Sequence, residues 1–358
     1  MLAISTVLLT ASLTGDHGSD TTASQRAHLT IDGETGTDGI GISGEDFHSR
    51  SAAAHAGADS ESAIEVACAA APKDAGSLMK CADAYHRVKQ YDREIEQLDQ
   101  AVPLASEADR VEIYFLRAIA YVDKHEVHPA IRDLDRALVL CPKKAIIFVA
   151  RGNIRLFMKN YDLAIADFGA AIALERDSLA FYGRGRAYAL KNDYVGALGD
   201  LNESLAIKPD DADVLTYRGA VRVHFGQLAL AMNDLNEALK LKPDNAVALI
   251  VRGNAYTNEG EFKRAIEDYT NAFGLQPKRI EARRQRAWPE LALGRLDDAL
   301  ADFEAMLVAT PKSARSLYGR SLVERRRGDV DAAERDLAAA HSINPNIEAT
   351  VAREENFK

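Results

Sequence analysis

Cysteine, proline and long apolar runs are all scarce in this chain of 358 residues. The three cysteines, Cys68, Cys81 and Cys141, exclude a fold that depends on many disulfides. No stretch approaches the roughly 18 to 20 apolar residues of a membrane span. Basic residues are outnumbered, 44 against 54 acids, and the net charge of −10 argues against a nucleic acid partner or an anionic membrane surface.

Chain length and composition favour a folded protein with more than one core. Hydrophobic residues make up 47% and charged residues 27% of the chain. Because 358 residues exceed an ordinary single core, we expect either several domains or one elongated array of repeats.

The first 60 residues differ from the rest in composition. They contain no proline, much Ser, Thr, Gly and Asp, and eight acidic residues against the two bases Arg26 and Arg50. Such a stretch buries too little apolar surface to offset its ordering entropy, so residues 1–60 are predicted to be a disordered acidic lead segment. Within it, Leu2 to Leu13 is similar to the apolar core of a secretory signal but has no Lys or Arg before it. Both a cytoplasmic location and export, to the periplasm for example, therefore stay open.

From about residue 61 the chain repeats itself every 34 residues. Prolines mark the interval, and one interval is a residue shorter. Seven alanines recur in step, each followed four residues later by a bulky apolar residue. The prolines are Pro142, Pro209, Pro243, Pro277, Pro311 and Pro345, and the alanines are Ala130, Ala164, Ala197, Ala231, Ala265, Ala299 and Ala333.

Small residues and glycines complete the repeating unit. Small residues recur in the helical stretch before each alanine of the series, where they allow two helices to approach closely. Four glycines lie between the two helical stretches, where a chain reversal favours positive φ. The small residues are Ala118, Gly152, Gly185, Gly219, Gly253, Ala287 and Ser321, and the reversal glycines are Gly226, Gly260, Gly294 and Gly328. Two antiparallel helices of this kind cannot cover their own apolar faces, so they must stack on neighbours.

This unit resembles the tetratricopeptide repeat, with a small residue and an aromatic in its first helix, Ala–aromatic–Ala in its second, and then Pro. Tyr85, Tyr121, Tyr188 and Tyr256 match the first-helix aromatic. We count about eight copies, which begin near residues 75, 111, 145, 178, 212, 246, 280 and 314. The resemblance implies an all-α fold, an α-solenoid that winds as a right-handed superhelix. The solenoid, with a degenerate half repeat at its start, is expected over residues 61–347 and a capping helix over residues 348–358.

One feature departs from the family. Arginine replaces the usual first-helix leucine in seven copies, and an aspartate follows sixteen residues later in each. The first copy has Cys81 and Gln97 instead, and this joint loss indicates contact. We predict seven structural ion pairs, bidentate in geometry. They are Arg117–Asp133, Arg151–Asp167, Arg184–Asp200, Arg218–Asp234, Arg252–Asp268, Arg286–Asp302 and Arg320–Asp336.

The resemblance also places a partner on the concave side, which first helices line. Its early part is apolar and aromatic, and its late part combines Arg with aromatics, which favours acidic residues or a terminal carboxylate. The predicted partner-binding residues are Phe115, Ile119, Val149, Asn153, Phe157, Tyr182, His224, Asn254, Asn258, Arg284, Trp288, Tyr318, Arg325 and Arg326. Asn153 and Asn254 match one Asn of the family's clamp for two carboxylates, but the second Asn is unmatched, so that clamp is not expected.

The sequence lacks the familiar motifs for phosphate binding and for zinc-dependent catalysis. The sequence has neither a phosphate-binding G-x-x-x-x-G-K-[ST] loop nor H-E-x-x-H. His125 and His128 are three apart in an interhelical turn, a poor zinc site without further ligands. No catalytic residue, metal or cofactor is therefore expected. Cys68 and Cys81 fall on consecutive helices, where export would allow a disulfide and a reducing compartment would leave two small packing residues.

The function predicted from the sequence is a non-enzymatic scaffold that binds a protein or peptide partner. The alternative is an adaptor of the cell envelope that supports a separate carbohydrate-active or other enzyme. Oligomeric state is left open.

Overall fold

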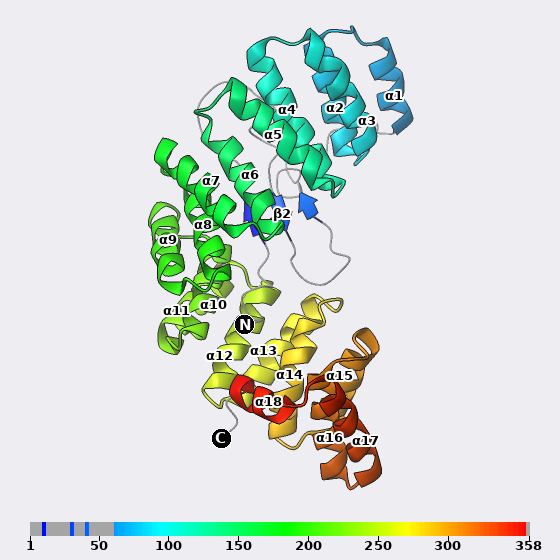
Figure 1. Cartoon of the computed structure of the whole chain (residues 1–358), viewed down its shortest axis with the longest axis vertical. Coiled ribbons are helices and arrows are strands. Elements are labelled where there is room, and N and C mark those ends of the chain that lie inside the picture. The colour runs from blue at the N-terminus through cyan, green and yellow to red at the C-terminus, as the bar shows by residue number, and fades with distance from the viewer. Residues whose placement is uncertain (1–8, 12–28, 32–39, 43–60, 356–358) are drawn as a thin grey trace. The chain divides into compact units, whose positions relative to one another are not determined.

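The computed structural model describes residues 9–11, 29–31, 40–42 and 61–355 (Figure 1). Most of the predicted lead segment over residues 1–60 therefore lies outside the described residues. Within it are three strands, β1 (Leu9–Ala11), β2 (Leu29–Ile31) and β3 (Ile40–Ile42), paired antiparallel in that order, with Thr10 opposite Thr30 and Thr30 opposite Gly41.

All other regular elements in the described part of the chain are helices, and the fold is an all-α solenoid, as predicted. Two compact units are present, Met1–Pro209 and Asp210–Lys358. The first unit contains α1 (Glu61–Ala70), α2 (Ala75–Arg87), α3 (Tyr91–Ala101), the 3-10 turn η2 (Val102–Leu104), α4 (Glu107–Asp123), α5 (Val127–Leu140), α6 (Ala145–Phe157), α7 (Tyr161–Leu174), α8 (Ser178–Leu190) and α9 (Tyr194–Ile207). The second contains α10 (Ala212–His224), α11 (Leu228–Leu241), α12 (Ala246–Asn258), α13 (Phe262–Leu275), α14 (Glu281–Ala292), α15 (Leu296–Ala309), α16 (Ala314–Arg327), α17 (Val330–Ile343) and α18 (Ile347–Glu355).

Helices α2 to α17 form eight consecutive pairs. In seven of them the two helices pack most extensively on each other, whereas α14 packs equally on α13 and on its partner α15. The first helices begin within one residue of the predicted starts, except α4, which begins four residues early at Glu107. Its start is set by Ser106, whose hydroxyl accepts the backbone N–H of Asp109 at 3.2 Å. The last helix, α18, packs on the final repeats through the buried Ile347 and Val351. That residues 348–358 serve as a cap stays a prediction.

Each pair reverses through one residue with positive φ. In the last four pairs this residue is a glycine, as predicted, with φ between +73° and +91°. In the first four pairs it is Lys89, His125, Lys159 or Asn192, with φ between 60° and 65°. The reversal therefore has one geometry throughout, and half of the repeats adopt it without glycine.

Close helix approach explains the series of small residues. A Cβ atom on Gly253 would lie 2.5 Å from the ring of Tyr269, and one on Gly152 would lie 3.0 Å from the ring of Phe168. Both rings are buried between helices. The glycine on the first helix therefore leaves room for the large aromatic side chain of the second helix to be buried between them.

Candidate functional site

All seven predicted Arg–Asp pairs are present and each is bidentate. In every pair the arginine Nε and Nη2 donate to the two carboxylate oxygens of the aspartate, over 2.5–3.1 Å. The arginine lies on the first helix and its aspartate on the second helix of the same repeat. Asp302 is fully buried, and the other six aspartates are also buried. The pairs therefore join the two helices of the last seven repeats inside the fold.

Four of these arginines also bind the preceding repeat, a contact that the sequence analysis missed. Their Nη1 atoms donate to a side chain on the previous second helix. The acceptors are Asp99 for Arg117 (2.5 Å), Asp135 for Arg151 (2.6 Å), Asn236 for Arg252 (2.9 Å) and Thr270 for Arg286 (3.0 Å). One arginine thus connects three helices and two repeats. Because these acceptors are chemically different, no repeated residue type marked them in the sequence.

The aspartates favour the charged form of their partners. The hydrogen bonds that Arg252 donates to Asp268 raise the pKa of Arg252, and those that Arg286 donates to Asp302 raise the pKa of Arg286. Two aspartates accept a second arginine from the first helix, one turn after the first arginine. Arg155 Nη1 lies 2.7 Å from Asp167. In the same way, Arg222 Nη1 lies 2.6 Å from Asp234. Arg155 and Arg222 occupy the position of the family's first-helix aromatic. Both guanidinium groups bind an aspartate of the same repeat, so they have a structural role without a ligand.

First helices of successive repeats lie next to one another in the second unit, where α10 contacts α12, α12 contacts α14, and α14 contacts α16. They line one face of that unit, which we call the first-helix face. Its helices carry the predicted late partner-binding residues.

The predicted partner-binding residues differ in burial. Six are buried, four are half-buried and four are exposed. The buried side chains are Phe115, Ile119, Val149, Asn153, Tyr182 and Trp288; the half-buried ones are Phe157, Asn254, Arg284 and Tyr318; the exposed ones are His224, Asn258, Arg325 and Arg326. All four exposed residues belong to the second unit. The role of all fourteen in binding stays a prediction, and only those that reach solvent can meet a partner on the surface as described.

Several of the buried or half-buried members have identifiable packing roles. Trp288 packs edge-on against Phe303, with ring centroids 5.3 Å apart. Asn254 accepts the hydroxyl of Tyr269 at 2.8 Å, and Arg284 pairs with Glu281 at 2.9 Å. These contacts give the side chains a reason to be present that does not involve a ligand.

Arg325 and Arg326 are the two exposed arginines among the predicted partner-binding residues of the first-helix face. They occupy the last turn of α16, where positive charge also stabilises the helix end. Arg326 Nη1 donates to the carbonyl of Leu291 at 2.7 Å, which fixes that side chain over α14. In the described part of the chain, no carboxylate pairs with either guanidinium. The half-buried Tyr318 precedes Arg325 by two turns of α16, so both lie on the same side of that helix. Burial raises the pKa of Tyr318, Glu348 raises it further, and Arg325 lowers it.

No group of three or more His, Cys, Asp or Glu side chains suited to a metal ion occurs among residues 61–355 and the three strands. Over the same residues, no helix combines the length and apolarity needed to span a membrane.

Comparison with known proteins supports the repeat. Two family models described as tetratricopeptide repeat match this chain, one over residues 149–212 and 284–346 and the other over residues 246–279. Human tetratricopeptide repeat protein 13 is 28% identical over 134 residues, which cover 36% of this chain and 16% of that protein. The heat shock protein sti1 homolog of Schizosaccharomyces pombe is 36% identical over 83 residues, 23% of this chain and 14% of that protein. The chain thus matches only about a sixth of the length of these relatives.

Solved structures share the fold. A tetratricopeptide repeat protein from Parabacteroides merdae has a TM-score of 0.53 at 18% identity, and the match covers 67% of this chain and 96% of that protein chain. A chain of the APC/C hetero-tetramer Cut9–Hcn1 has a TM-score of 0.57 at 16% identity, and the match covers 83% of this chain and 59% of that chain. The two family models, together with the repeated helix pairs described above, show that the chain is built of tetratricopeptide repeats, and the solved structures show the same fold.

Proposed function

We propose that this protein–protein interaction scaffold binds an acidic peptide segment of a partner on the first-helix face of its second unit. The family supports a scaffold for protein interaction in general, and its fold is typically non-enzymatic. The site and the ligand chemistry are the proposal.

The observation that carries it is the exposed pair Arg325 and Arg326 beside Tyr318. Guanidinium groups bind carboxylates through parallel hydrogen bonds, and a neighbouring aromatic ring adds apolar contact. Asn258 and His224 are exposed on α12 and α10 of the same unit and extend the polar surface along successive repeats. An extended peptide can contact such a row residue by residue.

The first unit supports this choice by contrast. Its predicted residues Phe115, Ile119, Val149 and Tyr182 are each no more than 7% exposed. A hydrophobic segment would need these side chains at the surface. Of the two ligand chemistries predicted from the sequence, the acidic one therefore has the better support.

Fluorescence anisotropy with labelled peptides of equal length tests the proposal. An acidic peptide should bind the full chain more tightly than its amide counterpart, in which Gln and Asn replace Glu and Asp. Arg325→Glu should weaken the acidic peptide about tenfold, roughly 1.4 kcal/mol. The matched control Lys263→Glu makes the same charge change on the exposed side of α13. Equal losses for both variants would mean general charge attraction, and an unchanged Arg325→Glu affinity would reject the site.

One observation favours the alternative of a cell-envelope adaptor for a separate enzyme. Cys68 and Cys81 form a disulfide, and disulfides persist mainly in oxidising compartments. Fractionation of the native host with an antibody to the chain would test it, since recovery with cytosolic markers alone would argue against the envelope.

A further inference from the structure

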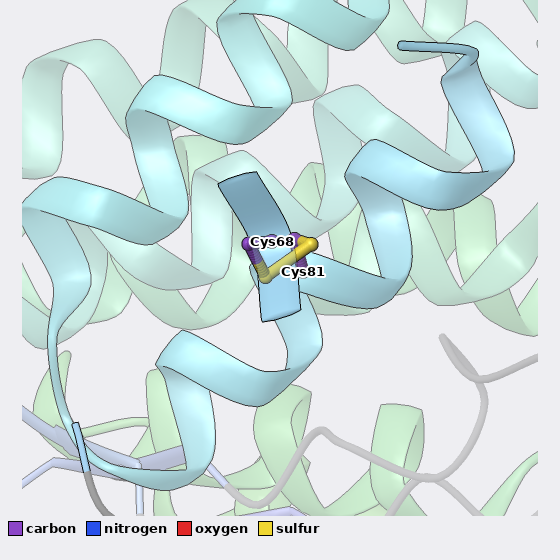
Figure 2. The surroundings of a disulfide bond; sticks show 2 residues. All are labelled: Cys68 and Cys81. Atoms are coloured by element: carbon purple, nitrogen blue, oxygen red, sulfur yellow. A yellow bond between two sulfur atoms is a disulfide. The ribbon is translucent and has the colours of Figure 1, made fainter. Parts of the chain in front are cut away.

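The helix α1 precedes the eight pairs and is held to them by a covalent bond. Figure 2 shows the bond between Cys68 on α1 and Cys81 on α2. Their Cα atoms are 5.7 Å apart, within the range of ordinary disulfides. Cys141, the remaining cysteine, is free and lies at the end of α5.

Cys81 stands at the repeat position that is arginine in the other seven copies. As described above, four of those arginines reach back to the second helix of the preceding repeat, for example Arg151 to Asp135. Cys81 also reaches back, to Cys68 on α1. The helix α1 therefore takes the place of a preceding second helix, and a disulfide replaces the polar contact between repeats.

Besides the disulfide, an apolar cluster and a surface ion pair connect α1 to the repeats. A small buried cluster joins Ile64 and Cys68 to Cys81 and Tyr85. The ion pair between Glu65 on α1 and Arg93 at 3.7 Å has both side chains more than half exposed, and such pairs contribute little. A ten-residue helix is also too short to be stable alone.

We propose that the Cys68–Cys81 disulfide makes the docking of α1 dependent on redox state. With the bond intact, α1 caps the first repeat. A dithiol reductant converts the bond to two thiols as its own two thiols become a disulfide, so two electrons and two protons pass to the cysteines. The cap helix then leaves α2, and the apolar side of α2 around Tyr85 becomes accessible. The first repeat thus has a closed and an open form, independent of the proposed peptide site.

Hydrogen exchange measured by mass spectrometry on the full chain tests this proposal. Oxidised protein should show protected amides over residues 61–70, and dithiothreitol should reduce that protection at least about tenfold. Helices α4 to α17 should not change. The double variant Cys68→Ser with Cys81→Ser should match the reduced protein in both conditions, whereas Cys141→Ser should respond to dithiothreitol as the unaltered chain does.

Three results would overturn the proposal. Equal protection of residues 61–70 in both redox states would mean that packing alone holds α1. Loss of protection throughout the first unit on reduction would make the disulfide a support of the whole unit rather than of a cap. Three free thiols in air-oxidised protein would mean that the bond does not form.

Discussion

Removing the aspartate of one Arg–Asp pair should destabilise the chain far more than removing an exposed carboxylate beside it. The pair between Arg252 and Asp268 suits this test because the other acceptor of Arg252, Asn236, is neutral. Asp268→Asn leaves the guanidinium with no carboxylate in its hydrogen bonds. The side chain of Asp268 is 6% exposed and that of Arg252 is 22% exposed. Breaking a fully buried pair costs about 3–5 kcal/mol, so we expect about 3 kcal/mol here.

The assay is urea unfolding of the full chain followed by helical circular dichroism. Glu267→Gln, one residue away and exposed on α13, should change stability by less than about 0.5 kcal/mol. Changing Arg252 and Asp268 both to Leu should restore most of the loss, because no charge is then stranded. Equal effects of Asp268→Asn and Glu267→Gln would contradict the reasoning about buried pairs. So would a double change to Leu that costs as much as Arg252→Leu and Asp268→Leu added together.

Three further predictions use the same unfolding assay. Gly253→Ala should cost about 1–3 kcal/mol because the new methyl overlaps the ring of Tyr269, and an unchanged midpoint would contradict the close approach. Lys159→Gly should stabilise the chain by up to about 1 kcal/mol by relieving a left-handed residue, whereas Gly226→Ala should destabilise it by a similar amount; effects of the same sign would refute the assigned turn geometry. Burial raises the pKa of Glu324, so the folded state holds that proton more tightly and stability falls as pH rises through the raised pKa. Glu324→Gln should therefore be the more stable protein at pH 7 by less than about 1 kcal/mol, and an unaltered pH profile would count against a partly buried carboxyl at this position.

The helix pairs were predictable because their signals recur. Prolines 34 residues apart, alanines in step and glycines between helices each record the same local geometry many times. The ion pairs were predictable for a related reason: the first copy lacks both Arg and Asp together, which points to direct contact between them.

Other features could not be read from the sequence. Lys89 and Lys159 adopt positive φ although lysine does not signal such a turn, so their sequence did not reveal the reversal. Side-chain contacts to the preceding repeat use Asp, Asn or Thr, so no single residue type reveals them. Burial was the hardest to predict: helical spacing places Phe115 and Tyr182 on a given face but does not say whether that face meets solvent.

Cross-linking of a bound peptide tests the central claim most directly. A photoreactive amino acid replaces Asn258 on the first-helix face in one variant of the full chain and Glu267 on the exposed side of α13 in another. After irradiation with the acidic peptide, mass spectrometry locates the adducts. The account predicts peptide adducts from position 258 and none from position 267. Adducts from position 267 alone would place the ligand on second helices and contradict the account.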